Sequence, residues 1–283
     1  MGTNPTIDKT EPLAKHVQDA RSMRYKHTKD GNTASSTHIV TTIDFSQNIA
    51  MPHSAQTPSM WYFLSLLNIL VFGIHNQPDN KQWNYVYSER KAGKGSNEVI
   101  SMLDWFARTQ IIYGDCIGDN KAVKSVSFNF LIKGHTKNNC DRGFANLKRY
   151  YAKRDMWNLD MVNDTIEGSA TSNTTRKTFL QGFKFPLQNL YKDLKGIQSY
   201  QIFTMDSSEP CKVRCQKRQS SAAVVVDLLR RKTDEVLSDG DIAEFWTSIK
   251  TATPPSSMRK KLWTCTTRYC NMFPLNIVIT PYT

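Results

Sequence analysis

Hydrophobic and polar positions alternate along HIVTTIDFSQNI, where β-branched residues are frequent from Ile39 onward. This period of two is typical of a β-strand, with Asp44 inside it or near its end. Two further apolar runs, LLNILVFGIHN and QWNYVYSER, predict a second and a third strand. Residues 77–80, which lie between these runs, include Pro and Asp and favour a reversal of chain direction. The core is therefore expected to begin with three strands.

The hydrophobic period then changes. Val99, Met102, Leu103 and Phe106 are spaced at i, i+3, i+4 and i+7, which predicts an amphipathic helix that begins near Ser96.

Two more strands and a second helix are expected after this helix. The run IIYGD predicts a short strand that ends at Asp115, and VSFNFLIKGH predicts another that ends near His135. Phe144, Leu147 and Tyr151 then lie three and four positions apart, so a helix is expected here too. Asp141 belongs to this second helix.

The pattern divides the chain into four parts. Residues 1–36 are polar and are expected to form a flexible N-terminal lead, and residues 37–155 are expected to form the core. Residues 156–250 are interpreted as the C-terminal part of the same domain, with a loop-rich insertion. Residues 251–283 contain several prolines and are expected to form an irregular tail.

Charge adds a candidate partner to this picture. Lys and Arg number 37 against 25 Asp and Glu, for a net charge of +12. Such an excess usually indicates a polyanionic partner, most often nucleic acid, although a basic protein without such a partner is the plainer interpretation. The most apolar run, residues 61–75, is shorter than the roughly 20 residues that a membrane helix needs. No membrane partner is therefore expected.

The cysteines do not indicate a structural metal site. Six cysteines without a signal peptide fit a reducing compartment better than a disulfide framework. Cys211 and Cys215, and also Cys265 and Cys270, are spaced more loosely than zinc ligands usually are. The GKGS turn at residues 93–96 lacks the spacing of a phosphate-binding loop, so it is interpreted as a turn before a helix.

Three aspartates fall at positions that suggest shared chemistry. Asp44 lies on the first expected strand, Asp115 at the end of the fourth and Asp141 on the second helix. This order is similar to the ribonuclease H-like fold, an α/β fold in which a mixed sheet is flanked by helices and three carboxylates meet at one edge. Two divalent ions about 4 Å apart need anionic oxygen ligands and can stabilise the attacking and leaving oxygens of a phosphodiester displacement. Each aspartate taken alone could equally be a helix cap, a turn residue or a surface charge.

Several blocks strengthen this interpretation, because they resemble a family of transposon-derived eukaryotic proteins with a ribonuclease H-like domain of the DDE/DDD transposase type. The blocks are IDFSQN, VFGIHN, GKGSNEVIS, GDCIGDNK, FLIKGHTKNNCDRGF and, near the C-terminus, LKGIQSYQIFTMDSSEP.

The resemblance implies a role for each site residue. Asp44, Asp115 and Asp141 would be catalytic and would hold two Mg²⁺ ions, with Asp119 ranked behind Asp115 as a ligand. His135 and Lys137 belong to the same signature and could hold a phosphate or orient the attacking water, although His135 could instead only finish a strand. Lys137, Arg142, Lys148 and Arg149 are the candidate DNA-binding residues. The class also implies a nuclear location, and it leaves oligomerisation open.

The chain departs from the family pattern after Asp115. Only residues 116–125 separate Asp115 from the strand at Val126, where relatives have a crossover helix, and a crossover needs a dozen or more residues. One hypothesis is a metal-dependent nuclease or strand-transferase that acts on DNA. Because metal catalysis tolerates little displacement, the alternative is a catalytically inactive nucleic-acid-binding module derived from such an enzyme. A third alternative is an unrelated structural or interaction protein.

Overall fold

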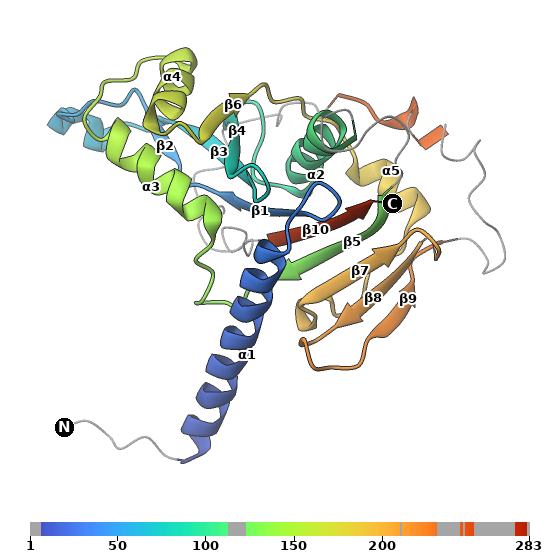
Figure 1. The fold of residues 1–283 in the computed structure, drawn as a ribbon. Helices are drawn as coiled ribbons and strands as arrows, with labels where there is room; N and C mark the ends of the chain where they lie inside the picture. Colours follow the sequence, from blue (N-terminus) through green and yellow to red (C-terminus); the bar gives the residue numbers. More distant parts are fainter. Residues whose placement is uncertain are drawn as a thin grey trace.

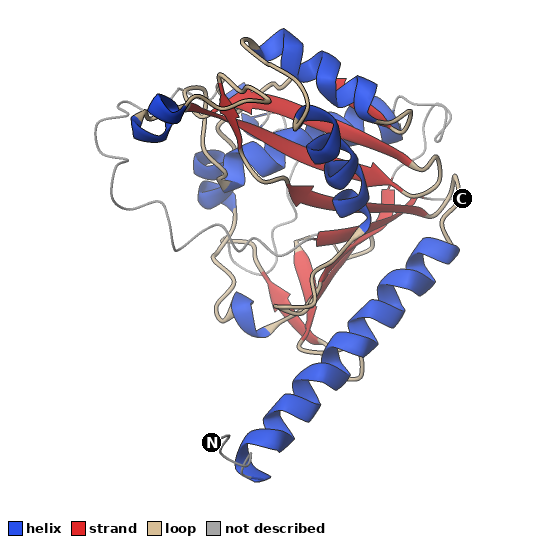
Figure 2. Cartoon of the chain, turned by 90° about the vertical axis from the view of Figure 1, so that its left-hand side faces the viewer, coloured by secondary structure: helices blue, strands red, loops and turns tan. Residues whose placement is uncertain are grey.

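A ten-stranded mixed sheet runs through the chain, with helices packed on both of its faces (Figures 1 and 2). The computed structural model describes residues 7–112, 123–209, 211–230, 244–245, 247–251 and 275–281. Along the sheet the strand order is β6-β4-β3-β1-β10-β5-β7-β8-β9, and β2 pairs with β3. The α/β class predicted from the sequence is therefore confirmed.

The elements have the following bounds. The strands are β1 (Ile39–Phe45), β2 (Ile49–Met51), β3 (Leu67–Asn76), β4 (Lys81–Ser88), β5 (Val123–Phe130), β6 (Asn173–Arg176), β7 (Ile202–Asp206), β8 (Lys212–Gln216), β9 (Val224–Asp227) and β10 (Leu275–Pro281). The α-helices are α1 (Ile7–Asn32), α2 (Ser96–Phe106), α3 (Asn139–Tyr151), α4 (Leu159–Ser169) and α5 (Lys184–Leu190). Three short helical segments are η1 (Ser59–Phe63), η2 (Ala107–Ile112) and η3 (Ile197–Ser199).

The first three predicted strands and both predicted helices are confirmed. β1, β3 and β4 form an antiparallel run, with a turn at residues 77–80. Side chains alternate between the two faces of β3, as the pleat of a strand requires. Leu70, Phe72 and Ile74 pack in one cluster with residues of α2, while Ile69 and Val71 pack in another with residues of α3 and α4. Both faces of the central strands are thus buried.

The predicted strand IIYGD is wrong at its start. Ile111 and Ile112 end η2, a π-helical segment that continues α2, while residues 113–115 and the shortened stretch after them lie outside the described residues. The strand expected to end near His135 also ends earlier, since β5 stops at Phe130. The strand prediction for IIYGD depends on apolar content alone, and a short apolar run does not distinguish a strand from a buried helical turn.

A central strand comes from the tail that was expected to be irregular. β10 lies between β1 and β5 and is antiparallel to both. β1 and β5 therefore run in the same direction, with one strand between them. Without β10, each of them would present an unpaired edge of backbone N–H and C=O groups. The prediction of an irregular tail is thus wrong for residues 275–281.

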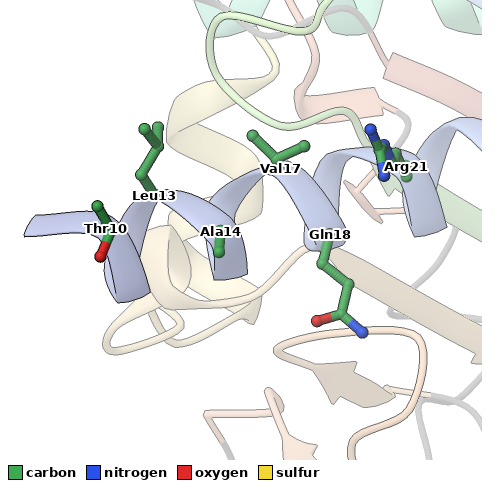
Figure 3. A pocket seen from close by; sticks show the side chains of 6 residues that line it. All are labelled: Thr10, Leu13, Ala14, Val17, Gln18 and Arg21. Atoms are coloured by element: carbon green, nitrogen blue, oxygen red, sulfur yellow. The ribbon is translucent and has the colours of Figure 1, made fainter. Parts of the chain in front are cut away.

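The N-terminal segment also differs from its prediction. Residues 7–32 form the helix α1, whose N-terminal half projects from the sheet (Figure 1), instead of the flexible lead expected for residues 1–36. The C-terminal half is anchored, because Ala20 and Met23 are buried in a cluster with residues of β7 and of the loop after β5. A shallow hollow of about 630 Å³ lies along the projecting half and is lined by α1 residues alone: Thr10, Leu13, Ala14, Val17, Gln18 and Arg21 (Figure 3).

The C-terminal part extends the sheet at both ends. β6 is parallel to β4 at one end, and β7, β8 and β9 continue from β5 as antiparallel neighbours at the other. This part is therefore more regular than the sequence suggested. Among the residues described here, no helix has the length and apolar character that crossing a membrane requires.

Candidate active site

Asp44 lies near the end of β1 and is partly buried, opposite Gly73 of β3. Its Oδ1 accepts a hydrogen bond from the backbone N–H of Phe45 at 2.8 Å. Its Oδ2 accepts one from Nδ2 of Asn138 at 2.9 Å. The strand and the loop before α3 together fix the orientation of this carboxylate.

Asp141 lies in the first turn of α3, where the helix dipole favours a negative charge. Its Oδ2 accepts a hydrogen bond from the backbone N–H of Asn138 at 2.7 Å. Asn138 returns the interaction, because its Oδ1 accepts from the backbone N–H of Cys140 at 2.7 Å. This reciprocal arrangement is a capping box. Asp141 therefore has a structural role in starting α3, and that role occupies one of its carboxylate oxygens.

Asn138 joins the two aspartates, which are far apart in the sequence. Its side chain donates to Asp44 and its backbone donates to Asp141. Asn138 is itself 8 % exposed, so this link lies inside the structure. The structure thus brings Asp44 and Asp141 to one place beside the end of β1.

The environment raises the pKa of Asp44 above its ordinary value of 3.8. Burial is the largest cause, because it penalises the ionised form, and the negative charge of Asp141 adds to it. The hydrogen bonds from Asn138 and Phe45 and the positive charge of Lys94 oppose this rise without cancelling it. Because the negative charges of Asp44 and Asp141 repel each other, a cation bound between them would be electrostatically favourable.

A cleft of about 250 Å³ opens next to this pair, between α3 and the segment after β1. It is lined by Phe45, Ser46, Gln47, Ile49, Asp141, Phe144, Ala145, Leu147, Lys148 and Tyr151. Nζ of Lys148 donates to Oε1 of Gln47 at 3.3 Å. Nζ of Lys94 donates to the carbonyl of Ser46 at 3.2 Å. The cleft therefore combines a carboxylate with nearby ammonium groups, which suits a phosphate bound through a cation.

The other predicted site residues have different positions. Asp115 and Asp119 lie outside the described residues. The ring of His135 lies 5.3 Å from the ring of His16 on α1, and its backbone N–H donates to the carbonyl of Ile132 at 2.9 Å. His135 therefore does not finish a strand, since β5 stops at Phe130. Among the described residues, no hydrogen bond or ring contact joins His135 to Asp44 or Asp141.

The predicted DNA-binding residues are spread over α3 and the loop before it. Lys137 is exposed, and its carbonyl accepts from Arg24 of α1. Arg142, Lys148 and Arg149 are exposed on α3. Of the four, Lys148 lines the cleft.

Three residues of the site were not predicted from the sequence. Asn138, Lys94 and Gln47 all lie inside the quoted blocks, but no role was assigned to them. For Asn138 a signal was present, because Asn followed three positions later by Asp at the start of an apolar helical period is the pattern of a capping box. Lys94 and Gln47 gave no such signal, since only the fold brings them to the cleft.

The donor set fits a divalent cation. Asp44 accepts one described hydrogen bond at Oδ1 and one at Oδ2. Each oxygen therefore keeps a further lone pair that a cation could use. Mg²⁺ is usually held by one or two carboxylates together with waters and substrate phosphates. No group of three or more His, Cys, Asp or Glu side chains that could hold a metal occurs within the described ranges. Asp44 and Asp141 are the two carboxylates that Asn138 connects.

The raised pKa gives a prediction about stability. Because the pKa of Asp44 is higher in the folded protein than in the unfolded chain, ionisation of Asp44 costs folding free energy. That cost is absent below the ordinary value of 3.8, grows as the pH rises from there to the folded pKa, and is constant above it. The free energy of unfolding of Asp44→Asn minus that of wild type should therefore increase from pH 4 to pH 7 in EDTA. Urea titrations at several pH values measure this difference, and a difference that stays constant or falls would contradict the assignment.

Comparison with known proteins gives one match. Residues 111–223 match the profile of a family described as Domain of unknown function (DUF7869). The matched range includes Asp115, Asn138 and Asp141 but not Asp44. No curated protein and no solved structure matches the chain.

Proposed function

We propose that this protein derives from a transposase-like enzyme with a ribonuclease H-like domain, and that it binds DNA and acts on phosphodiester bonds with the help of Mg²⁺. The observation that carries the proposal is the link between Asp44 and Asp141 through Asn138, beside a cleft lined by Lys148. The order of the elements also supports it, because it is similar to the order expected for a ribonuclease H-like domain. β4, β3 and β1 form an antiparallel run, β1 and β5 run in the same direction, and α3 follows β5.

Each residue of the site would have its own role. Asp44 and Asp141 would hold the cation, which when bound supplies charge neutralisation at the phosphate and an activated water. Asn138 would hold both carboxylates in position. Lys148, which lines the same cleft as Asp141, would bind a phosphate oxygen there.

A second candidate is a DNA-binding module without catalysis. It is favoured by the antiparallel β10, which fills the position next to β1, and by the helical conformation of Ile111 and Ile112, where a strand leading to Asp115 was expected. Binding through Lys and Arg needs no metal and tolerates such changes.

DNA cleavage tests the proposal. Purified protein should nick supercoiled DNA with Mg²⁺, and Asp44→Asn and Asp141→Asn should each reduce the rate about 100-fold, because loss of even a residue that supports a metal ligand commonly costs 10–100-fold. Asp164→Asn, an exposed change on α4, is the matched control and should cleave as wild type does. Asp115→Asn tests the third carboxylate in the same assay.

Absence of cleavage by wild type, together with DNA binding that weakens steeply with salt, would favour the binding module. Absence of both activities would reject the proposal.

A further inference from the structure

An exposed group of large apolar side chains lies on and near η1. We call it the aromatic surface and define it as Met60, Tyr62, Phe63, Leu64 and Trp157, which are 67 %, 90 %, 90 %, 56 % and 57 % exposed. Scattered single apolar residues on a surface are ordinary, but a contiguous group of this kind marks a binding site.

The segment that carries these residues is attached to the chain after α3. His53 and Met156 exchange two backbone hydrogen bonds at 2.9 Å and 2.8 Å. The backbone N–H of Ala55 donates to Oδ1 of Asp155 at 3.0 Å. The ring of Trp61 meets that of Trp157 edge to face at 5.9 Å. The aromatic surface is therefore held in place before any partner binds, which lowers the entropy cost of binding.

The charge beside the aromatic surface is positive. Lys148, Arg149, Lys153 and Arg154 lie on the last turns of α3 and directly after it, and residues 52–66 contain no acidic side chain. Asp155, the acidic residue in this stretch, is bonded to the backbone of Ala55. The next helix, α4, carries several acidic side chains, so the basic stretch ends at Trp157. Aromatic side chains next to a basic stretch are the combination that binds unpaired nucleotides, because bases stack on the rings while the cations follow the phosphates.

The segment that carries the aromatic surface contacts the candidate active site through His53. The cleft that begins at Asp141 reaches Tyr151, and the ring of Tyr151 meets the ring of His53 edge to face at 5.0 Å. α3 connects these points, since Asp141 and Tyr151 lie at its two ends. At a rise of about 1.5 Å per residue, the helix separates them by about 15 Å.

We propose that the aromatic surface stacks against unpaired bases of a DNA strand whose phosphates follow the basic end of α3. The stacked bases would lie beyond the C-terminal end of α3, on the far side of the basic stretch from Asp141. The inference rests on the proposed function for the choice of DNA, and it adds single-stranded or unpaired DNA as the substrate class.

Fluorescence anisotropy with a labelled single-stranded oligonucleotide and with its matched duplex tests the proposal. Tyr62→Ala and Phe63→Ala should each weaken single-strand binding about 10-fold, as expected when a base loses its stacking partner. Duplex binding should stay within about twofold of wild type. Both residues are 90 % exposed, so their replacement leaves the buried core intact. Phe185→Ala, which removes a 73 % exposed ring from α5, is the matched control and should bind both DNAs as wild type does.

Unchanged single-strand affinity in both variants would overturn the proposal. Light scattering tests another occupant of this surface, a second copy of the chain. If the wild type is a dimer, and if Tyr62→Ala and Phe63→Ala make it a monomer without loss of DNA binding, the DNA-stacking proposal is wrong and the surface is an interface between copies. The result also separates this inference from the catalytic function. If single-strand binding depends on Tyr62 and Phe63 and no cleavage occurs, the stacking inference is supported and the catalytic function is not. If cleavage occurs and both variants bind single strands as wild type does, the catalytic function is supported and the stacking inference is not.

Discussion

A chain that ends at residue 274, and therefore lacks β10, is expected not to fold. β10 is paired along its length with β1 on one side and with β5 on the other. Its removal leaves two facing edges in the middle of the sheet, and each lost backbone hydrogen bond contributes about 0.5–1.5 kcal/mol. Because a whole domain is stable by only about 5–15 kcal/mol, the loss is of the same size as the total. Circular dichroism and thermal unfolding should show no cooperative transition.

The control for this truncation is a chain that ends at Pro281, which keeps all of β10. It should unfold cooperatively. The synthetic peptide LNIVITP, added to the shorter chain, should restore part of the transition by occupying the open position as an added strand. Equal melting temperatures for the two truncated chains would show that β10 does not belong to the sheet core.

Gly143→Val is expected to destabilise the protein by about 4 kcal/mol. Gly143 is buried on the face of α3 that packs on the sheet, and a Cβ atom there would lie 2.2 Å from Oε1 of Gln82. Gln82 is 2 % exposed, and its Nε2 donates to Oδ1 of Asn84 at 2.9 Å, so it cannot turn away without losing a buried hydrogen bond. Overpacking costs about 1–3 kcal/mol, and the broken bond adds about 1–3 kcal/mol. Urea denaturation measures the sum.

Gly93→Val is the matched control, because a Cβ atom at Gly93 would have nothing within 4 Å. It should change the free energy of unfolding by less than about 1 kcal/mol. If Gly143→Val lowers the free energy of unfolding no more than Gly93→Val does, α3 does not pack closely on β4. Since α3 carries Asp141, close packing here also fixes one half of the candidate active site.

Local patterns were sufficient to predict the elements with a strong hydrophobic period. β1 was visible from its alternating apolar and polar residues and its β-branched content, although both of its faces are buried. α2 and α3 were visible as a helical period, because each of them buries one regular face. α1 was missed because its mean hydropathy is low and, within residues 10–32, only Ala20 and Met23 of its apolar residues are buried. β10 was missed because the prolines of residues 251–283 favoured an irregular tail, although the run from Ile277 to Thr280 is β-branched throughout. Its pairing with β1 and β5, which are distant in sequence, could not be predicted from this run alone.

The candidate active site was predicted only in part, for a similar reason. Asp44 and Asp141 were chosen from the order of the elements and from the family resemblance, and the structure brings them together. Their connector, Asn138, carries no charge and was given no role, although it bonds to both. Lys94 approaches Asp44 through the turn before α2, a proximity that depends on how the sheet and that turn fold.

Binding of Mn²⁺ measured by isothermal titration calorimetry tests the central claim most directly. The wild-type protein should bind Mn²⁺, and Asp44→Asn and Asp141→Asn should each weaken this binding at least about 10-fold, while Asp164→Asn leaves it unchanged. If wild type binds no Mn²⁺, or if all three variants bind it as tightly as wild type does, Asp44 and Asp141 do not form a cation site.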